Sequence, residues 1–422
     1  MDRINFLKDL NRKYFNGELS TNFLTRLQQL PVDRPDVFSF VERMFNFVRL
    51  SGIPAKDLSL FHADVMGTLL ARILPGGWGG KIPPITVQGR HAIIDTYIGN
   101  NPYLKSNGKT MLDIGCGFPP FTTIEVSNYL KNWKVVGADP SLPAYLVYDE
   151  DGNYATFDDT KSIVYFQPAI PSIDNWNSLL SDVSATKKRF EQLLNEFLIN
   201  PKTEGFPRLE IDPIKSYETE FLSFKNGGIG EIEIEEKDVI RCFNVMYYFD
   251  NNFQDKALNW FSQKTVEGGI VMVGGDWAHS TECYYHLFQK ESGELRKKEF
   301  SFSIDCISPF AIVTWYTNFG DDWQKLDLVK YIKIIRSNEE FMDEFNAFHD
   351  SQRARNKLCP RDSQGYYGDI DHTLSPIELW SKIRAMHDEL IEAGFVQKVV
   401  KVLQLSGIKA RVNEVNHIAI EL

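Results

Sequence analysis

Asp113, Gly115 and Gly117 are spaced so that they could hold a ligand at a tight turn. They belong to the run Met-Leu-Asp-Ile-Gly-Cys-Gly-Phe-Pro-Pro, residues 111–120. The apolar residues at its start predict a short buried strand, and the prolines at its end predict the first turn of a helix. Glycine has no Cβ and can take positive φ, so the backbone of such a turn can approach a ligand closely. The start of the helix would add unpaired N–H groups and the positive end of its dipole.

A second carboxylate follows at the end of the next predicted strand. Residues 133–139 read Trp-Lys-Val-Val-Gly-Ala-Asp, which predicts a strand that ends in Asp139. An acidic residue at this place in an α/β sheet can accept hydrogen bonds from ribose hydroxyls. The two windows together predict a site for a cofactor that carries a nucleoside.

The details of the turn favour one class of cofactor. A dinucleotide fold prefers G-x-G-x-x-G, whereas this turn reads D-x-G-x-G and continues into prolines. A carboxylate at the ligand repels a pyrophosphate and suits a cationic amino-acid tail. The turn resembles that of class I S-adenosylmethionine (SAM) methyltransferases. The resemblance implies SAM as cofactor, with Asp113, Gly115 and Gly117 under its methionine part and Asp139 on its ribose. Cys116 lies in the same turn and is counted with these residues, although close packing is its main expected role.

A second window further along the chain supports this resemblance. A predicted strand runs into an aromatic loop over Asp238–Asp250, and Asn251–Thr265 has apolar residues at helical spacing. Gly268–Gly269 is expected to end this helix as a C-cap, and Ile270–Asp276 predicts another buried strand. This order is similar to the fourth and fifth strands of class I methyltransferases. The run Asn244–Asp250 is also similar to chemotaxis-receptor glutamate methyltransferases, but the glycine turn departs from that subfamily, so its substrate is not carried over.

The remaining elements predict the fold class. Glu220–Asn226 fits a third strand, and the resemblance places Asn226 near the adenine. Phe395–Gly407 predicts a helix, and residues 409–415 and 417–422 predict a closing strand pair. The expected fold is α/β, with a Rossmann-like seven-stranded, mostly parallel sheet and an antiparallel closing pair.

The chain is longer than this core requires. Residues 1–105 predict a helical N-terminal region with amphipathic helices over residues 36–50 and 58–74. The SAM-binding core is expected at 106–276 plus 391–422, with an insertion at 141–215 in which Asp151–Gly152 predicts a hairpin turn. Residues 277–390 are expected to form an inserted substrate cap, which begins with a hairpin around residues 291–294.

The carboxyl ends of the fourth and fifth strands carry the candidates for catalysis, because such ends face the ligand crevice. His279, Asp276 and Tyr247 are the catalytic candidates, with His279 as general base. A lone histidine is more often a surface or structural residue than a catalytic one, and Asp276 can instead cap a turn. Methyl transfer depends mainly on positioning, and a base is needed only when the nucleophile is protonated.

Three further residues at the same strand ends are assigned to binding. Asn244 is expected to contact the cofactor, and Tyr248 and Trp277 are expected to contact the acceptor. Aromatic packing at the strand end is an equal alternative for Tyr247 and Tyr248.

Composition narrows the possible partners. The chain has 422 residues, 43% hydrophobic and 24% charged, with a net charge of -11 and no long basic run. This argues against a nucleic-acid partner, which requires a concentrated basic face. The absence of a signal segment and of an apolar run of about 18 residues predicts a cytoplasmic protein without membrane association. Five scattered cysteines predict reduced thiols, and the eight histidines lack metal-binding spacing, so no metal is expected.

The sequence therefore predicts a SAM-dependent methyltransferase that acts on a small or medium-sized molecule in a covered aromatic pocket. Three alternatives stay open: a protein or peptide acceptor, a SAM-fold protein that binds without turnover, and an NAD-dependent oxidoreductase. The missing third glycine and the acid that opens the turn disfavour the last of these.

Overall fold

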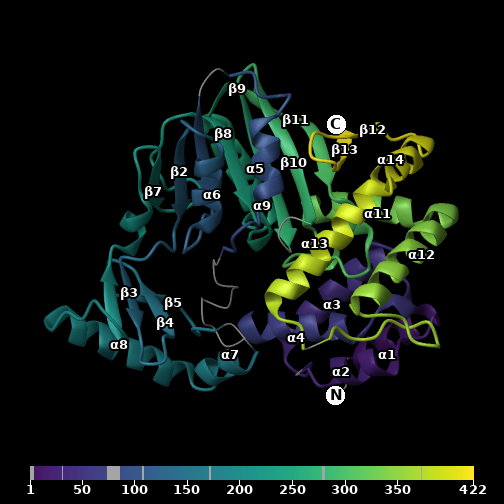
Figure 1. The fold of residues 1–422 in the computed structure, drawn as a ribbon, viewed down its shortest axis with the longest axis horizontal. Helices are drawn as coiled ribbons and strands as arrows, with labels where there is room; N and C mark the ends of the chain where they lie inside the picture. The colour runs from purple at the N-terminus through teal and green to yellow at the C-terminus, as the bar shows by residue number, and fades with distance from the viewer. Residues whose placement is uncertain are drawn as a thin grey trace. The chain divides into compact units, whose positions relative to one another are not determined.

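The computed structural model of the chain describes residues 4–30, 32–73, 86–106, 109–170, 173–277, 281–371 and 373–422. The chain forms two compact units. Unit 1 contains Met1–Val65, Gln88–Met111 and Ile234–Leu422, and unit 2 contains Met66–Val87 and Leu112–Glu233. Figure 1 labels their helices and strands.

Unit 1 contains strands of the larger sheet in the order β12-β13-β11-β10-β9-β8. Parallel pairing joins β8 to β9, and antiparallel pairing joins β9, β10, β11, β13 and β12 in turn. The bounds are β8 Lys237–Phe243, β9 Thr265–Trp277, β10 Glu282–Glu291, β11 Glu294–Phe302, β12 Ala410–Val412 and β13 Ile418–Glu421. β8 is buried at every position, as expected of a central strand.

The helices of unit 1 pack their apolar faces against this sheet and one another. In α14, valines and leucines at helical spacing are buried in one cluster with residues of β11, β13, α11 and α12. Figure 1 shows α11, α12 and α14 beside this part of the sheet. The bounds are α1 Ile4–Phe15, α2 Thr21–Gln28, α3 Pro35–Leu50, α5 Ala92–Gly99, α9 Asn251–Lys264, α10 Ile312–Trp315, α11 Trp323–Arg336, α12 Glu339–Asn356, α13 Pro376–Glu392 and α14 Phe395–Leu405. The 3₁₀ turns of this unit are η1 Ala55–Asp57, η3 Met246–Tyr248 and η4 Ile304–Ile307.

Two helices differ from the others, one in its place in the two units and one in its backbone angles. α4 (Leu60–Ile73) begins in unit 1 and ends in unit 2. Residues 5–14 of α1 have left-handed backbone angles, with φ between +39° and +51°. Such angles cost about 1–2 kcal/mol per residue, and no described contact explains them.

Unit 2 contains the strand order β1-β2-β7 and the helix α6 (Phe121–Tyr129). β1 (Thr110–Ile114) starts at the end of the unit 1 segment and continues into unit 2. β2 (Lys134–Asp139) pairs in parallel with β7 (Leu222–Asn226), and Asp139 lies opposite Asn226. A Cβ on Gly137 of β2 would lie 2.7 Å from the Phe224 ring, so this strand position requires glycine.

The insertion of unit 2 forms a second, four-stranded sheet in the order β5-β4-β3-β6. β3 (Tyr145–Tyr148) and β4 (Tyr154–Phe157) form the predicted hairpin, and Gly152 has the positive φ (+79°) that its turn requires. The other elements are β5 Ile163–Gln167, α7 Ile173–Leu180, α8 Val183–Ile199, β6 Arg208–Ile211 and η2 Pro213–Tyr217. Side chains of α8 pack with β3–β6 residues in a core of their own.

The prediction of a Rossmann-like α/β fold with parallel strands and an antiparallel closing pair is confirmed. Beyond the seven predicted strands, the described residues of unit 1 add β10 and β11, the hairpin predicted around residues 291–294. The interpretation of Gly268–Gly269 as a helix C-cap is wrong, because α9 ends at Lys264 and both glycines lie inside β9. The division into a core and a substrate cap stays a prediction, and the two units have different bounds from it.

Candidate functional site

In unit 2, the predicted glycine turn connects β1 to α6. Gly115 and Gly117 have φ of +77° and +63°, conformations that side chains other than glycine rarely adopt. Gly115 N and Cys116 N donate to Ala138 O at 2.8 Å and 3.3 Å. The turn is therefore bonded to the end of β2, and Cys116 is buried within it.

The Asp139 carboxylate closes the turn from the other side. Its Oδ2 accepts from Gly117 N at 3.0 Å, and its Oδ1 accepts from Ser141 N at 2.8 Å and from the Ser141 hydroxyl. Burial raises the pKa of Asp139, the nearby Asp113 carboxylate raises it further, and the hydrogen bonds oppose this rise. A carboxylate can accept about four hydrogen bonds, and the described residues supply three of them to Asp139.

The Asp113 side chain of β1, which precedes the turn, is also held by a hydrogen bond. Thr123 Oγ1, in the first turn of α6, donates to Asp113 Oδ2 at 2.6 Å, and both side chains are buried. The start of α6 is closed by Thr86, whose hydroxyl accepts from Phe121 N at 3.0 Å. Asp113, Gly115, Cys116, Gly117 and Asp139 thus lie together, as the sequence predicted. Asn226 lies at the adjacent end of β7 and is exposed.

In unit 1, Asp276 at the end of β9 is the centre of a buried polar network. Its Oδ1 accepts from Arg90 Nε at 2.7 Å and from Asn244 Nδ2 at 2.5 Å, and Asp276 N donates to Asn244 Oδ1 at 3.1 Å. Arg90 Nη2 also donates to Asp276 O at 2.9 Å. His91 Nε2 lies 3.2 Å from Asp276 Oδ2. The predicted residues Asp276 and Asn244 are therefore brought together.

The charges of this network determine its chemistry. Burial alone would raise the pKa of Asp276, but His91 and the Arg90 guanidinium lower it well below its usual range. Burial lowers the pKa of His91, and the Asp276 carboxylate opposes this shift. A carboxylate that stays ionised and is held by a guanidinium is a weak base, and its bonds orient the end of β9.

Tyr247 and Tyr248 lie in η3, at the carboxyl end of β8. Their ring centroids are 4.5 Å apart, and Tyr247 also meets the Tyr316 ring edge-on at 5.7 Å. Burial raises the pKa of both tyrosines, and Arg90 opposes this shift. Both side chains are partly exposed, so the strand end presents an aromatic surface beside the Arg90 charge.

Trp277, the residue after Asp276, lines a cavity of about 230 Å³ within unit 1. All lining residues except Phe61 and Val65 come from residues 277–390, the segment predicted as the substrate cap. His279, the predicted base, lies outside the described residues. Arg90 and His91 were missed by the sequence analysis; their one local signal is that two polar residues directly precede the apolar helix α5.

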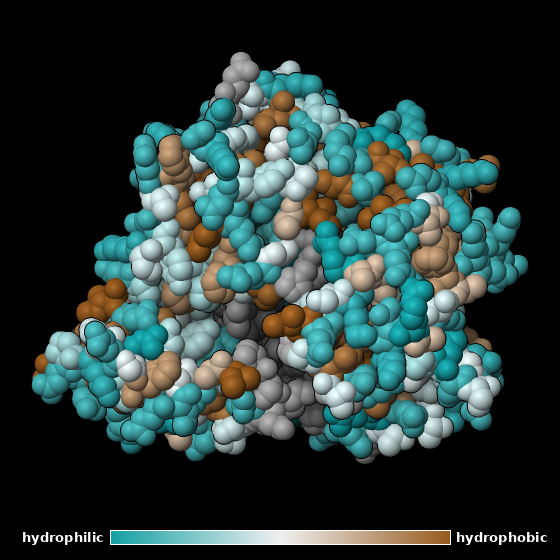
Figure 2. All heavy atoms as spheres, viewed as in Figure 1, coloured by the Kyte–Doolittle hydropathy of each residue, from teal (hydrophilic) through white to brown (hydrophobic). Residues whose placement is uncertain are grey.

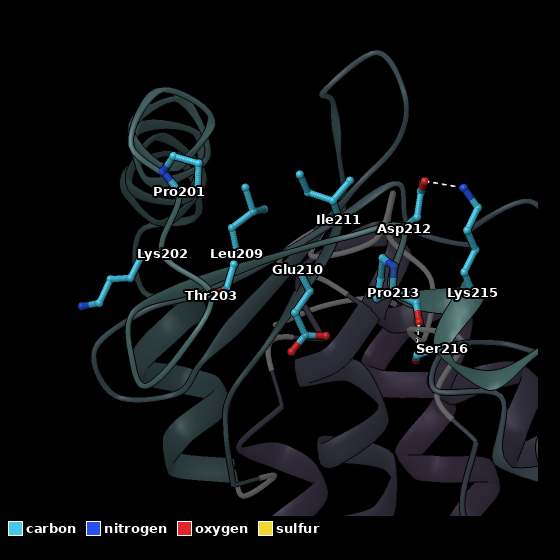
Figure 3. Close-up of a pocket in the computed structure, with 10 residues that line it drawn as sticks. All are labelled: Pro201, Lys202, Thr203, Leu209, Glu210, Ile211, Asp212, Pro213, Lys215 and Ser216. Atoms are coloured by element: carbon cyan, nitrogen blue, oxygen red, sulfur yellow. Dashed lines mark hydrogen bonds and ion pairs between the residues drawn. The ribbon is translucent and has the colours of Figure 1, made fainter.

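A second hollow, of about 700 Å³, lies in unit 2 between the end of α8 and η2. Figure 3 shows its lining, in which Lys215 pairs with Asp212 at 2.6 Å and Ser216 donates to Pro213 O at 2.7 Å. It is open, and none of the predicted site residues lines it. The side chains of Asp212, Lys215 and Ser216 are already bonded, so it is the weaker candidate for a binding site.

Other features of the described residues bear on partners. All five cysteines are buried free thiols. Over the parts of the chain that the structure covers, no three His, Cys, Asp or Glu side chains are arranged to hold a metal ion, and no helix has the length and apolarity to span a bilayer. The face in Figure 2 is mainly hydrophilic, with apolar side chains in separate small groups.

Comparison with known proteins gives structural neighbours only. No family model matches the sequence, and no curated protein matches it. One similar solved structure is the N-methyltransferase NodS from Bradyrhizobium japonicum (13% identity, TM-score 0.21), which covers 44% of this chain and 67% of its own. Another is a putative SAM-dependent methyltransferase from Methanococcus maripaludis (13% identity, TM-score 0.24). The match covers 85% of this chain and 88% of the neighbour's chain.

A third neighbour is coclaurine N-methyltransferase bound to N-methylheliamine and S-adenosylhomocysteine (11% identity, TM-score 0.24). The match covers 99% of this chain and 95% of the neighbour's chain. All three neighbours are described as methyltransferases. Their TM-scores and identities are low, so these likenesses by themselves assign no activity to the chain.

Proposed function

We propose that this protein is a SAM-dependent methyltransferase. The glycine turn of unit 2 carries the proposal. Gly115 and Gly117 have positive φ between a buried strand and a helix start, and Asp139 binds the turn from the next strand. We infer that a ligand would approach the backbone at this turn, beside the two carboxylates of Asp113 and Asp139. Acidic side chains suit a nucleoside with a cationic amino-acid tail better than a pyrophosphate.

The residues of the turn fit SAM. The Asp139 carboxylate would accept its fourth hydrogen bond from a ribose hydroxyl, and the backbone at Gly115 and Gly117 would lie under the methionine part. SAM supplies a methyl carbon on a positive sulfur: the acceptor's lone pair bonds to that carbon, and the electrons of the C–S bond stay on sulfur. Asn226, at the end of β7, is the proposed adenine contact, and Cys116 packs beneath the turn.

The unit 1 residues receive separate roles in this proposal. Asp276 and Asn244 are bonded to each other and to Arg90, so we assign them to positioning the end of β9. Tyr247 and Tyr248 would offer an aromatic surface to a cationic group. His279 stays the proposed proton acceptor for an acceptor atom that is protonated at working pH.

A small-molecule acceptor is supported by the cavity that Trp277 lines. The cavity is enclosed mainly by apolar and aromatic side chains, the usual lining of small-molecule sites. A protein or peptide acceptor would instead need an extended surface. We therefore propose a small molecule as the acceptor.

The decisive experiment is parallel calorimetric titration of the purified protein with SAM, S-adenosylhomocysteine and NAD. Binding of both adenosyl ligands with micromolar affinity, and no binding of NAD, supports the proposal. Binding of NAD alone would replace it with a dinucleotide-dependent activity. Absence of binding by all three would favour a protein that has the fold without the cofactor. Gly117→Ala, which strains a positive-φ position, should abolish binding, whereas the exposed hairpin variant Gly293→Ala should not.

A further inference from the structure

The cavity in unit 1 has aromatic walls and an interior of small-molecule size. Phe61, Trp277, Phe310 and Trp380 contribute rings to its lining, and its volume is about 230 Å³. At about 30 Å³ for each water, this holds roughly eight waters. A ligand of this cavity is therefore a single small molecule with an apolar body.

Arg353 of α12 places a buried cation at this cavity. The side chain is 8% exposed, its guanidinium lies 3.3 Å from the centroid of the Phe310 ring, and Nη1 donates to Leu358 O at 2.8 Å. Its Nε is buried with no acceptor, and Arg353 forms no ion pair within the described residues. A guanidinium held in place by one ring and one carbonyl keeps donors free for a planar anion such as a carboxylate.

Glu282, the first residue of β10, places a carboxyl group at the same cavity. Its Oε2 accepts weakly from Val313 N at 3.4 Å, and in the described part of the chain it pairs with no cation. Burial raises the pKa of Glu282 to about 8, and the Asp305 carboxylate raises it further, while Arg353 opposes the shift. Glu282 is therefore largely protonated near pH 7 and would ionise beside a ligand cation.

The other polar side chains near Glu282 each have at least one partner, although Nδ1 of His349 has none within the described residues. Asp305 is paired with His387 Nδ1, which raises the pKa of His387 although burial lowers it. His349 Nε2 lies 3.2 Å from the Ser308 hydroxyl, and burial keeps the imidazole neutral. The Lys325 ammonium is bonded to Val313 O. Within the described residues, Arg353 and Glu282 are thus lining residues that can carry a charge and form no ion pair, although each lies close enough to shift the pKa of the other.

We propose that this cavity binds a small zwitterionic α-amino acid with an apolar, preferably aromatic, side chain. Arg353 receives its carboxylate, Glu282 receives its ammonium group, and Phe61, Phe310 and Trp380 enclose its side chain. A zwitterion satisfies both groups at once, whereas a simple amine would leave the Arg353 charge unmatched and a simple acid would leave Glu282 without its partner.

A purely structural role of the two residues predicts different behaviour. Glu282 could serve only to cap α10 through Val313 N, and Arg353 could serve only to pack on Phe310. In that case the two residues would affect stability but would not distinguish ligands by their charged groups. The test therefore measures selectivity among ligands of one shape.

The experiment is calorimetric titration of the full chain with L-phenylalanine, L-tyrosine, L-tryptophan and L-leucine. Phenethylamine and 3-phenylpropionate are included because they are phenylalanine without its carboxylate and without its amine. At least one amino acid should bind, and L-phenylalanine should bind at least tenfold more tightly than either truncated analogue. The proposal is overturned if no amino acid binds at millimolar concentration, or if either analogue binds within threefold of L-phenylalanine.

Two cavity variants assign the charged groups. Glu282→Gln should weaken binding of the preferred amino acid at least tenfold and leave 3-phenylpropionate unchanged. Arg353→Gln should weaken the amino acid equally and leave phenethylamine unchanged. Glu294→Gln, at the exposed β10–β11 turn, is the matched control and should bind as wild type does. Equal loss of all ligands in a cavity variant would indicate a structural role and overturn the assignment.

The role of this ligand as methyl acceptor rests on the proposed function, but its binding does not. If an amino acid binds but is not methylated in the presence of SAM, the proposed amino-acid site stands and the proposed methyltransferase activity is wrong. If the protein binds SAM and methylates another compound but binds no amino acid, the proposed methyltransferase activity stands and the proposed amino-acid site is wrong.

Discussion

Replacing Asp139 with alanine tests the glycine turn most directly. The change removes three hydrogen bonds, from Gly117 N, Ser141 N and the Ser141 hydroxyl. Hydrogen bonds to a charged group contribute about 1.5–3 kcal/mol each, and two buried N–H groups would lose their acceptor. Loss of the buried carboxylate also recovers desolvation energy, because burial raises its pKa. The net loss of stability in the turn should be about 2–4 kcal/mol.

Hydrogen exchange measured by mass spectrometry can localise this effect. Amides of the peptide that spans residues 112–125 should exchange at least about tenfold faster in Asp139→Ala, since each 1.4 kcal/mol corresponds to a factor of ten. Affinity for SAM should fall by about 1–3 kcal/mol through the lost ribose contact. Ser141→Ala removes one of the three bonds and should have a smaller effect, near 1 kcal/mol.

The matched control is Asp182→Ala. Asp182 is also an aspartate of unit 2 that accepts from a backbone amide, Ala185 N at 2.9 Å, but it caps the exposed start of α8. The substitution Asp182→Ala should lower the stability of the protein by about 1 kcal/mol and leave hydrogen exchange at residues 112–125 unchanged. Unchanged exchange and unchanged SAM affinity in Asp139→Ala would refute both the bonding of the turn and its role in binding.

Three further changes give separate tests. Asp276→Ala leaves the Arg90 guanidinium without its carboxylate and should cost about 3–5 kcal/mol, seen as a lower urea midpoint; an unchanged midpoint would contradict the network. Glu282→Gln should gain stability relative to wild type as pH rises from about 5 to 8. Over that window the Glu282 carboxyl ionises in the unfolded wild type but stays largely protonated in the folded protein, where its pKa is raised to about 8, so rising pH favours unfolding of the wild type; a pH-independent difference would contradict the shift. Ser375→Ala removes the capping box of α13 and should cost about 1 kcal/mol, measured by thermal unfolding, with no effect expected if the helix start is frayed.

Features that depend on neighbouring residues could be predicted from the sequence. Asp151–Gly152 predicted a hairpin, and Tyr148 pairs with Tyr154 across it. The strand, glycine turn and helix around Gly115 follow the prediction because positive φ and apolar alternation are properties of adjacent residues. Such signals need no knowledge of the rest of the chain.

The prediction at Gly268–Gly269 failed for a specific reason. A glycine C-cap must directly follow the helix, but α9 ends at Lys264 and β9 starts at Thr265. The register between β8 and β9 shifts after Lys237, and a Cβ on Gly269 would lie 2.8 Å from Asp238 O. Gly269 serves the close approach of two strands, a contact that the local sequence does not encode, and Gly268 has a positive φ of +77° inside β9.

The polar network at Asp276 also depends on a contact that the local sequence does not encode. Arg90 bonds to Asp276 across 186 residues, and no local pattern joins them. Asp276 itself was found because strand ends in α/β sheets gather functional residues. Its role changes once Arg90 is present, since an ionised carboxylate that a guanidinium holds is better suited to positioning than to proton transfer.

The end of β9 connects that network to the cavity. Asp276 and Trp277 are consecutive: the first is fixed by Arg90 and Asn244, and the second lines the cavity. Loosening Asp276 therefore has to move the Trp277 backbone as well, since one peptide unit joins them. Arg90→Met should for this reason reduce ligand binding in the cavity without touching any ligand, whereas loss of Glu282 should alter ligand selectivity. The two defects separate the residues that position the cavity wall from those that recognise what it binds.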